Sequence, residues 1–327
     1  MLGLLPLSAG YAAPTPHELA EPSHAAAAPP VYFLHLHKSG GTSFVTTATE
    51  RGLYHGTDEG VIGRDESELD TFPAKALSKC SGLKDERCCL RRDTAKHRGM
   101  TVCEPGHNVE SGPNACSQGF DPEIEMCGGD LRYITLIRDP MQRLLSHMCQ
   151  HTLVPPDVDA ALFPDPKAKK ATRTVLTDAK TTKWPAGPGL DNYYVRALAG
   201  PSAWALPIGA LNETHLAAAQ RSLQQFDVVM RLERLTDDLQ QMAQLSPALS
   251  WPNLLDSEVN SCPGRGPPLS EFTKPGSWQR IVDANSFDRR LYAWADQMVE
   301  ARMWKFQEER NRKHSDLEGI AGIVRKS

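Results

Sequence analysis

Residues 31–44 constrain the fold of this chain more than any other stretch, because an apolar run ends at Lys38 and the chain then turns through two glycines into hydroxyl residues. This order predicts a strand, a tight turn and the start of a helix. The glycines let backbone N–H groups converge on an anion, the hydroxyl residues add donors at the helix N-terminus, and the lysine supplies a mobile positive charge. The candidate anion-binding residues are Lys38, Ser39, Gly40, Gly41, Thr42 and Ser43.

The order of residues in this loop differs from that of the Walker A loop of ATPases, in which the lysine follows the glycines. Here Lys38 precedes them. A strand–turn–helix with a purely structural role is the alternative, since short motifs also occur by chance. A second segment of the same architecture favours the binding function.

Residues 131–146 repeat this architecture. An apolar strand ends at Arg138, Asp139 is placed to cap the following helix, and Pro140 occupies its first turn. Ser146 lies further along that helix, so Arg138 and Ser146 can hold one phosphate together if the helix packs back onto the sheet. Arginine suits a planar, two-point grip on a phosphate.

The two segments resemble the 5′-phosphosulfate loop and the 3′-phosphate strand–helix of sulfotransferases that use 3′-phosphoadenylyl sulfate (PAPS). The motifs look most like those of the Golgi heparan sulfate O-sulfotransferases, and plant tyrosylprotein sulfotransferases are similar in the same motifs. The first motif departs from the family at His37, where proline is usual, and at Ser39, where threonine is usual. The resemblance covers residues 31–309, with weaker similarity in the stretches 191–200, 211–239 and 287–306.

The resemblance implies a three-layer, P-loop-like α/β fold in which helices flank a central parallel sheet. The length agrees, because about 280 residues can form one large sheet-centred domain. Residues 53–130 are interpreted as a cysteine-rich insert in this domain, and residues 152–190 as an irregular loop on the acceptor side. Residues 1–30 are expected to be a signal or anchor remnant with an Ala/Pro-rich stem, and residues 310–327 a basic polar tail.

The resemblance also implies a reaction with PAPS as co-substrate. Residues 38–43 would hold its 5′-phosphosulfate, and Arg138 with Ser146 its 3′-phosphate, which leaves the sulfuryl group exposed. An acceptor hydroxyl then attacks sulfur in line, while Lys38 stabilises the departing phosphate oxygen. No metal is required by this chemistry.

A general base must take the proton of the acceptor hydroxyl, and the resembling enzymes carry a histidine for this task between the two motifs. His107 is the preferred candidate, because it lies in a Gly/Pro turn ahead of the second strand. His97 is the alternative base, and His55, just after the first helix, comes third. His35 and His37 are expected to lie in the core or behind the loop.

The expected acceptor is a polysaccharide or other glycan, with a protein tyrosine as the alternative, because the stretches that would face the acceptor do not align with the family. Two basic runs, residues 84–98 and 167–173, can bind an anionic glycan or simply be solvated surface. The net charge of −4 and the pI near 6.3 provide no basic field for nucleic acid.

Two interpretations of another kind stay open. A nucleotide- or glycan-binding module of the same fold without catalysis is motivated by His37, which replaces proline beside the lysine. A kinase-like phosphotransferase is disfavoured by the position of the lysine and by the lack of an evident acidic pair for magnesium.

The cysteines favour a secretory location. Six of the eight lie between Cys80 and Cys127, in a segment that needs disulfides to be ordered, whereas zinc is disfavoured because no paired C-x-x-C occurs. Cys149 is expected to be a buried free thiol or a partner of the insert. The sequon at Asn212 adds weak support.

The expected compartment is therefore the Golgi lumen. The apolar N-terminus is a minimal signal peptide, the remnant of a membrane anchor or an ordinary tail. A membrane contact is expected only through such an anchor.

Further elements are predicted downstream. Asn212 is placed to cap a helix over residues 213–225, which leads into a buried parallel strand over residues 226–230. A helix over residues 237–245 follows, and a long helix opens at residue 285 or 286.

The stretch 191–200 leaves two roles open for its polar residues. Arg196 either reaches the acceptor or the nucleotide, or forms an ordinary salt bridge with Asp191. Tyr193 and Tyr194 either stack on the ligand or pack in the core.

Overall fold

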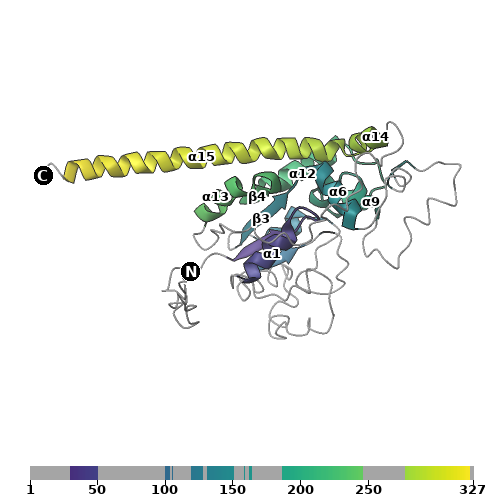
Figure 1. Cartoon of the computed structure of the whole chain (residues 1–327), viewed down its shortest axis with the longest axis horizontal. Helices are drawn as coiled ribbons and strands as arrows, with labels where there is room; N and C mark the ends of the chain where they lie inside the picture. Colours follow the sequence, from purple (N-terminus) through teal and green to yellow (C-terminus); the bar gives the residue numbers. More distant parts are fainter. Residues whose placement is uncertain are drawn as a thin grey trace, which may run out of the picture.

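The computed structural model describes residues 30–50, 100–103, 105, 119–127, 131–150, 158, 162–163, 186–245 and 277–324, which form an α/β arrangement with a central sheet flanked by helices (Figure 1). The sequence-based expectation of an α/β fold with a parallel sheet is thereby confirmed. The proposed stem, both basic runs, and the candidate bases His97 and His107 lie outside these residues. So do most of the segments interpreted as the insert and the acceptor-side loop.

Four parallel strands form the sheet, in the order β2-β1-β3-β4. Leu34 of β1 pairs with Cys103 of β2 on one side and with Thr135 of β3 on the other, and Ile137 of β3 pairs with Arg231 of β4. All four carboxyl ends therefore lie along one edge. The strands are β1 Val31–Leu34, β2 Met100–Cys103, β3 Arg132–Ile137 and β4 Val228–Arg231.

The helices described by the structure differ widely in length. They are α1 Gly41–Glu50, α5 Pro122–Glu125, α6 Pro140–Gln150, α9 Ala186–Leu190, α10 Tyr193–Leu198, α11 Pro201–Trp204, α12 Glu213–Gln224, α13 Leu235–Leu245, α14 Ser277–Ala284 and α15 Ser286–Val324, with a 3-10 turn, η2, at Leu232–Arg234.

Both faces of the sheet are buried, which explains the nearly continuous apolar strands. Side chains alternate between the faces along each strand. Phe33 and its neighbours on one face pack against α1 and α13 in one cluster, whereas Tyr32 and Leu34 on the other pack against α10, α12 and α15 in a second. A third cluster joins α6 to α9 and α14. The layers are thus helix, sheet and helix.

Local signals in the sequence predicted several element boundaries. Asp139 caps α6 by accepting hydrogen bonds from the N–H groups of Met141 and Gln142, at 3.0 and 2.9 Å. Asn212 caps α12 by accepting from the N–H group of Thr214 at 3.0 Å. Both predicted caps are confirmed.

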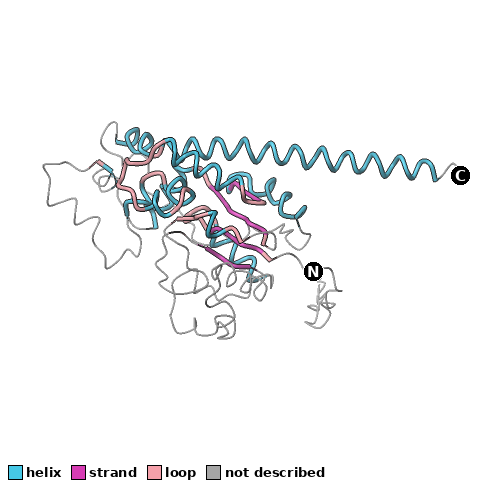
Figure 2. The backbone as a smooth tube through the Cα atoms, turned by 180° about the vertical axis from the view of Figure 1, so that it is seen from behind, coloured by secondary structure: helices cyan, strands magenta, loops and turns pink. Residues whose placement is uncertain are grey.

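The long C-terminal helix α15 begins at Ser286, as expected, but continues to Val324. It extends well beyond the sheet in both views (Figure 1, Figure 2). The helix therefore runs through most of residues 310–327, the segment expected to be a basic polar tail. Six of the seven residues from 307 to 313 are Gln, Glu, Arg or Lys, which are good helix formers. No helix in the described part of the chain is long and apolar enough to cross a membrane.

The cysteines of the described residues are all oxidised. Cys103, Cys127 and Cys149 each take part in a disulfide. The expectation that Cys149 is a free thiol is therefore wrong, and its alternative, a disulfide partner, is the one that stands.

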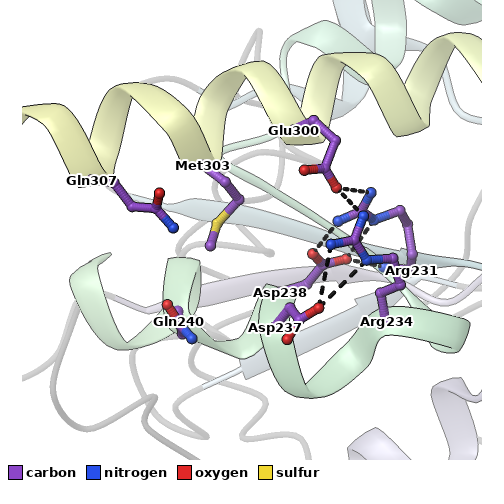
Figure 3. A pocket seen from close by; sticks show the side chains of 8 residues that line it. All are labelled: Arg231, Arg234, Asp237, Asp238, Gln240, Glu300, Met303 and Gln307. Atoms are coloured by element: carbon purple, nitrogen blue, oxygen red, sulfur yellow. Dashed lines mark hydrogen bonds and ion pairs between the residues drawn. The ribbon is translucent and has the colours of Figure 1, made fainter.

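A buried arginine ties the end of β4 to α13 and α15. Arg231 donates from Nε and Nη2 to both oxygens of Asp238, at 2.9 and 2.6 Å, and from its backbone N–H group to the same carboxylate at 2.7 Å. Its Nη1 also reaches Asp296 and Glu300 of α15. Arg231, Asp238 and Glu300 line a small polar pocket (Figure 3). Ion pairs fill this region, so we interpret it as a structural joint.

We expect Asp238→Ala to lower the free energy of unfolding by about 3 kcal/mol, because it leaves a buried guanidinium without its principal partner. The matched control is Asp237→Ala at the next position, where an exposed carboxylate pairs with Arg234 at 3.3 Å and a loss of about 1 kcal/mol or less is expected. Chemical denaturation of both variants measures the difference. Equal losses would contradict the structural role of this joint.

Candidate functional site

The order of the strands places a topological switch point between β1 and β3. From β1 the chain moves to β2 on one side, and then returns to β3 on the other side of β1. In open α/β sheets, ligands bind in the crevice outside the carboxyl ends of the strands at such a point. The two candidate anion-binding segments follow these two strands, so they lie next to each other at that edge.

The first segment forms the predicted strand, turn and helix. After β1 the chain turns at residues 37–40 and enters α1 at Gly41. Lys38 has a φ of 65° and Gly40 a φ of 89°, so the loop contains two left-handed residues. The first N–H groups of α1 have no partner within the helix and remain for other acceptors. The side chains of Lys38, Thr42 and Ser43 are partly exposed there.

Close packing under this loop requires a glycine at position 41. A Cβ atom there would lie 1.9 Å from Cδ2 of His35, which directly follows β1. His35 itself is buried, as expected from the sequence. The imidazole of His35 therefore fills the space under the start of α1.

The second segment also has the predicted form. Arg138 directly follows β3, and its side chain is partly exposed at the carboxyl edge of the sheet. The guanidinium of Arg138 makes no hydrogen bond or ion pair with the residues that the structure describes. Ser146, in α6, is also partly exposed. Both side chains are thus partly open to solvent, and Arg138 lies at this edge.

Helix α6 packs back toward the first loop. His147, next to Ser146, meets the ring of His37 edge-on at 5.4 Å between centroids. Arg143, one turn earlier on α6, lies with Cζ 4.8 Å from the ring centroid of Tyr193 and donates to the carbonyl of Gly189. Helix α6 therefore contacts the loop after β1 through His147, and the joint hold of Arg138 and Ser146 on one phosphate stays a prediction.

The two tyrosines of α10 connect both segments. The hydroxyl of Tyr193 accepts a hydrogen bond from the N–H group of His37 at 2.9 Å. The hydroxyl of Tyr194 lies 2.8 Å from Oγ of Ser39 and within 3.0 Å of both the N–H group and the carbonyl of Arg138. Both tyrosines are buried, so the expectation that they stack on a ligand is wrong and the packing alternative is correct.

Helix α10 is itself held by α15. The carboxylate of Asp288 accepts hydrogen bonds from the N–H groups of Tyr194 and Val195, both at 2.9 Å. Asn192, in a left-handed conformation, accepts from the N–H group of Asp288 at 3.0 Å. The amide of Asn285 accepts from the N–H group of Asn192 at 3.0 Å. Side chains thus position the tyrosine pair by hydrogen bonds to the backbone.

Basic side chains gather under the site, where the buried guanidinium of Arg143 and the ammonium of Lys38 carry positive charge. Burial lowers the pKa of His37 well below its ordinary value, and His147, Lys38, His35 and Arg143 lower it further. His37 is therefore neutral at physiological pH. Burial also lowers the pKa of Arg143, whose Nε and Nη1 make no hydrogen bond with any residue that the structure describes. Such a cluster favours an anion nearby.

The structure changes the role expected of two residues. Ser39 is completely buried, and its hydroxyl contacts Tyr194 instead of the open side of the loop. Arg196 is also completely buried, where it pairs with Asp191 and donates to the carbonyls of Leu206 and Pro207 at 2.7 and 2.9 Å. The salt-bridge interpretation of Arg196 is thus correct, and its role is to shape the chain after α10.

Sequence reasoning missed three contributors to the site. Arg143 and His147 lie four residues apart on α6, a spacing that puts them on one face, and this signal could have been noticed. The bridging role of Tyr194 had no local signal, because its partners are 155 and 56 residues away in the chain. The candidate bases His107 and His97 lie outside the described residues and stay predictions.

We expect the stability of this protein to fall as the pH rises from about 4 to 6, because of Asp288. Burial raises its pKa to about 6 from an ordinary 3.8. The folded state therefore binds a proton that the unfolded state has released in this range, and a contribution of about 2 to 3 kcal/mol is lost as the pH passes the folded pKa.

The measurement is the free energy of unfolding of the wild type and Asp288→Asn between pH 4 and 7. The difference in the free energy of unfolding between the wild type and Asp288→Asn should shrink by about 2 to 3 kcal/mol as the pH rises. Asp283→Asn, at an exposed position on α14, is the matched control and should follow the wild type. Parallel curves for the wild type and Asp288→Asn would contradict the raised pKa.

The comparisons add no family to these observations. No protein-family model matches this chain, and no curated protein matches it significantly. The two motifs and the edge where β1 and β3 end are therefore the features that indicate a function.

Proposed function

We propose that this protein is a PAPS-dependent sulfotransferase that transfers a sulfuryl group to a hydroxyl of a glycan. The observation that carries the proposal is the meeting of two anion-binding segments at the switch point between β1 and β3. Residues 38–43 and Arg138 end adjacent parallel strands there, and the guanidinium of Arg138 has no ion-pair partner in the described part of the chain. A ligand with two separate anionic groups matches this arrangement.

The loop after β1 is assigned to the 5′-phosphosulfate. Its N–H groups at the start of α1 and the ammonium of Lys38 would hold the phosphate oxygen that departs from sulfur. A well-placed donor at such a position stabilises the transition state by about 3–4 kcal/mol. Thr42 and Ser43 offer hydroxyl groups beside it, whereas the buried Ser39 supports the loop from behind.

Arg138 and Ser146 are assigned to the 3′-phosphate. Both are partly exposed, and α6 packs back toward the loop through His147. The guanidinium would grip the phosphate at two points, as arginine does in many phosphate sites. The two grips together would orient the sulfuryl group toward an acceptor.

The general base and the acceptor are assigned from the sequence alone. His107 is proposed as the general base, with His97 as the alternative, and the acceptor is proposed to be a polysaccharide. The P-loop-like fold type and the cysteine-rich insert at residues 53–130 belong to the same proposal. The disulfides at Cys103, Cys127 and Cys149 support a secretory compartment such as the Golgi lumen, where disulfides form and persist.

We expect the purified protein to bind adenosine 3′,5′-bisphosphate, the nucleotide product of the reaction, in a calorimetric titration. Arg138→Ala should weaken binding at least about tenfold, which corresponds to about 1.4 kcal/mol for one charged contact. Arg132→Ala is the matched control, because Arg132 begins the same strand about 20 Å away and pairs with Asp227 at 3.3 Å. It should bind like the wild type.

Two results would overturn the proposal. Failure of the folded wild type to bind the bisphosphate would leave a strand–turn–helix with a structural role only. An equal loss of affinity in both variants would place the nucleotide away from the edge where β1 and β3 end. Binding as expected justifies a screen of glycan acceptors with PAPS, with tyrosine peptides as the competing class.

A further inference from the structure

We infer that the hydroxyl of Tyr194 is a positioning group that fixes the spacing between the two anion-binding segments, and so selects ligands that carry two phosphate groups. This inference rests on the proposed function and deepens it. Tyr194 does not touch the ligand in this account. It acts through Ser39 in the first segment and through Arg138 in the second.

The geometry of the hydroxyl supports this role. It lies 2.8 Å from Oγ of Ser39, 3.0 Å from the backbone N–H group of Arg138 and 3.0 Å from the carbonyl of Arg138. One oxygen atom therefore bonds to both segments at once. The two segments are far apart in the chain, and Tyr194 belongs to a third element, α10.

The protons of these groups can be assigned by counting. The carbonyl of Arg138 can only accept, so the single proton of Tyr194 must be donated to it. The N–H group of Arg138 donates to one lone pair of the phenolic oxygen. The contact with Ser39 must then have Ser39 as donor, to the other lone pair. Tyr194 is thus fully used, and the hydroxyl proton of Ser39 is no longer available to a phosphate.

The surroundings of Tyr194 keep its hydroxyl protonated and its backbone in place. Tyr194 is 1 % exposed, and burial raises the pKa of its hydroxyl above the ordinary value. It therefore stays protonated throughout the physiological range. The backbone of Tyr194 is fixed by the carboxylate of Asp288 at 2.9 Å. A rigid anchor in α10 thus holds both segments from below.

A fixed spacing matters most to a ligand that occupies both segments. Such a ligand gains from preorganised contacts, because binding one phosphate brings the second to its partner without further loss of freedom. A ligand with one phosphate contacts one segment only and does not gain from the spacing. Tyr194 should therefore affect bisphosphates far more than monophosphates.

The neighbouring tyrosine provides a matched control. Tyr193 is equally buried, and its hydroxyl accepts a hydrogen bond from the N–H group of His37, at 2.9 Å, in the first segment. Tyr193→Phe removes a hydroxyl of the same kind without cutting the link between the segments.

The experiment titrates the wild type, Tyr194→Phe and Tyr193→Phe with three probes: adenosine 3′,5′-bisphosphate, adenosine 5′-phosphate and adenosine 3′-phosphate. Tyr194→Phe should weaken the bisphosphate about tenfold and each monophosphate by about twofold or less. Tyr193→Phe should change the bisphosphate and the 5′-phosphate by the same factor and leave the 3′-phosphate unchanged. A purely structural loss would weaken all three probes together.

Ser39→Ala tests the same link from its other end and serves if Tyr194→Phe does not fold. It should reproduce the selective loss of bisphosphate affinity, and the double variant should lose no more than either single variant. Losses that add would show that the two hydroxyl groups act separately, and would overturn the inference.

The outcomes separate this inference from the proposed function. Failure of the folded wild type to bind the bisphosphate overturns both. Bisphosphate binding that Tyr194→Phe leaves unchanged, or weakens by the same factor as the monophosphates, overturns the positioning role and keeps the nucleotide site. Selective loss in Tyr194→Phe supports both.

Discussion

The buried carboxylate of Asp288 holds the site together, because it joins the long helix α15 to the short helix α10 through two backbone N–H groups. Helix α10 has only six residues and could not hold its position alone. With its backbone fixed from α15, its two tyrosines reach the loop after β1 and the end of β3. The chain of contacts therefore runs from the C-terminal helix to the loops that we propose bind the nucleotide, although these elements are widely separated in sequence.

Helix α15 also contacts the sheet itself, at the end of β4. Asp296 and Glu300, about two and three turns further along α15, form ion pairs with Arg231 at the end of β4. Figure 3 shows the pair with Glu300. Arg231 also binds Asp238 of α13, which packs on the other face of the sheet. Helix α15 thus makes polar contacts at two places, one with α10 beneath the candidate site and one at the edge strand β4. The buried charges of Asp288 and Arg231 take part in these contacts.

The sequence predicted the elements around the site well, because the signals there are local. Glycines and hydroxyl residues after an apolar run produced a strand, turn and helix, and Asp139 and Asn212 cap the helices that follow them. The sequence did not predict that α15 continues to Val324, since good helix formers extend a helix without any apolar periodicity. Within the site, Lys38 and Arg138 lie where the motifs indicated. The hydroxyl of Ser39 does not face the open side of the loop, because it bonds to the hydroxyl of Tyr194 on α10.

By itself, the sequence determined that the chain has two strand–turn–helix segments with positive groups at the ends of parallel strands, since a few adjacent residues specify turns and caps. Only the tertiary structure decided that these segments are neighbours, because the strand order β2-β1-β3-β4 depends on contacts between distant parts of the chain. It also decided the partners of Tyr194 and Arg143, because these side chains bond to groups that lie far from them in the chain. Such long-range packing is not encoded in any short stretch of residues.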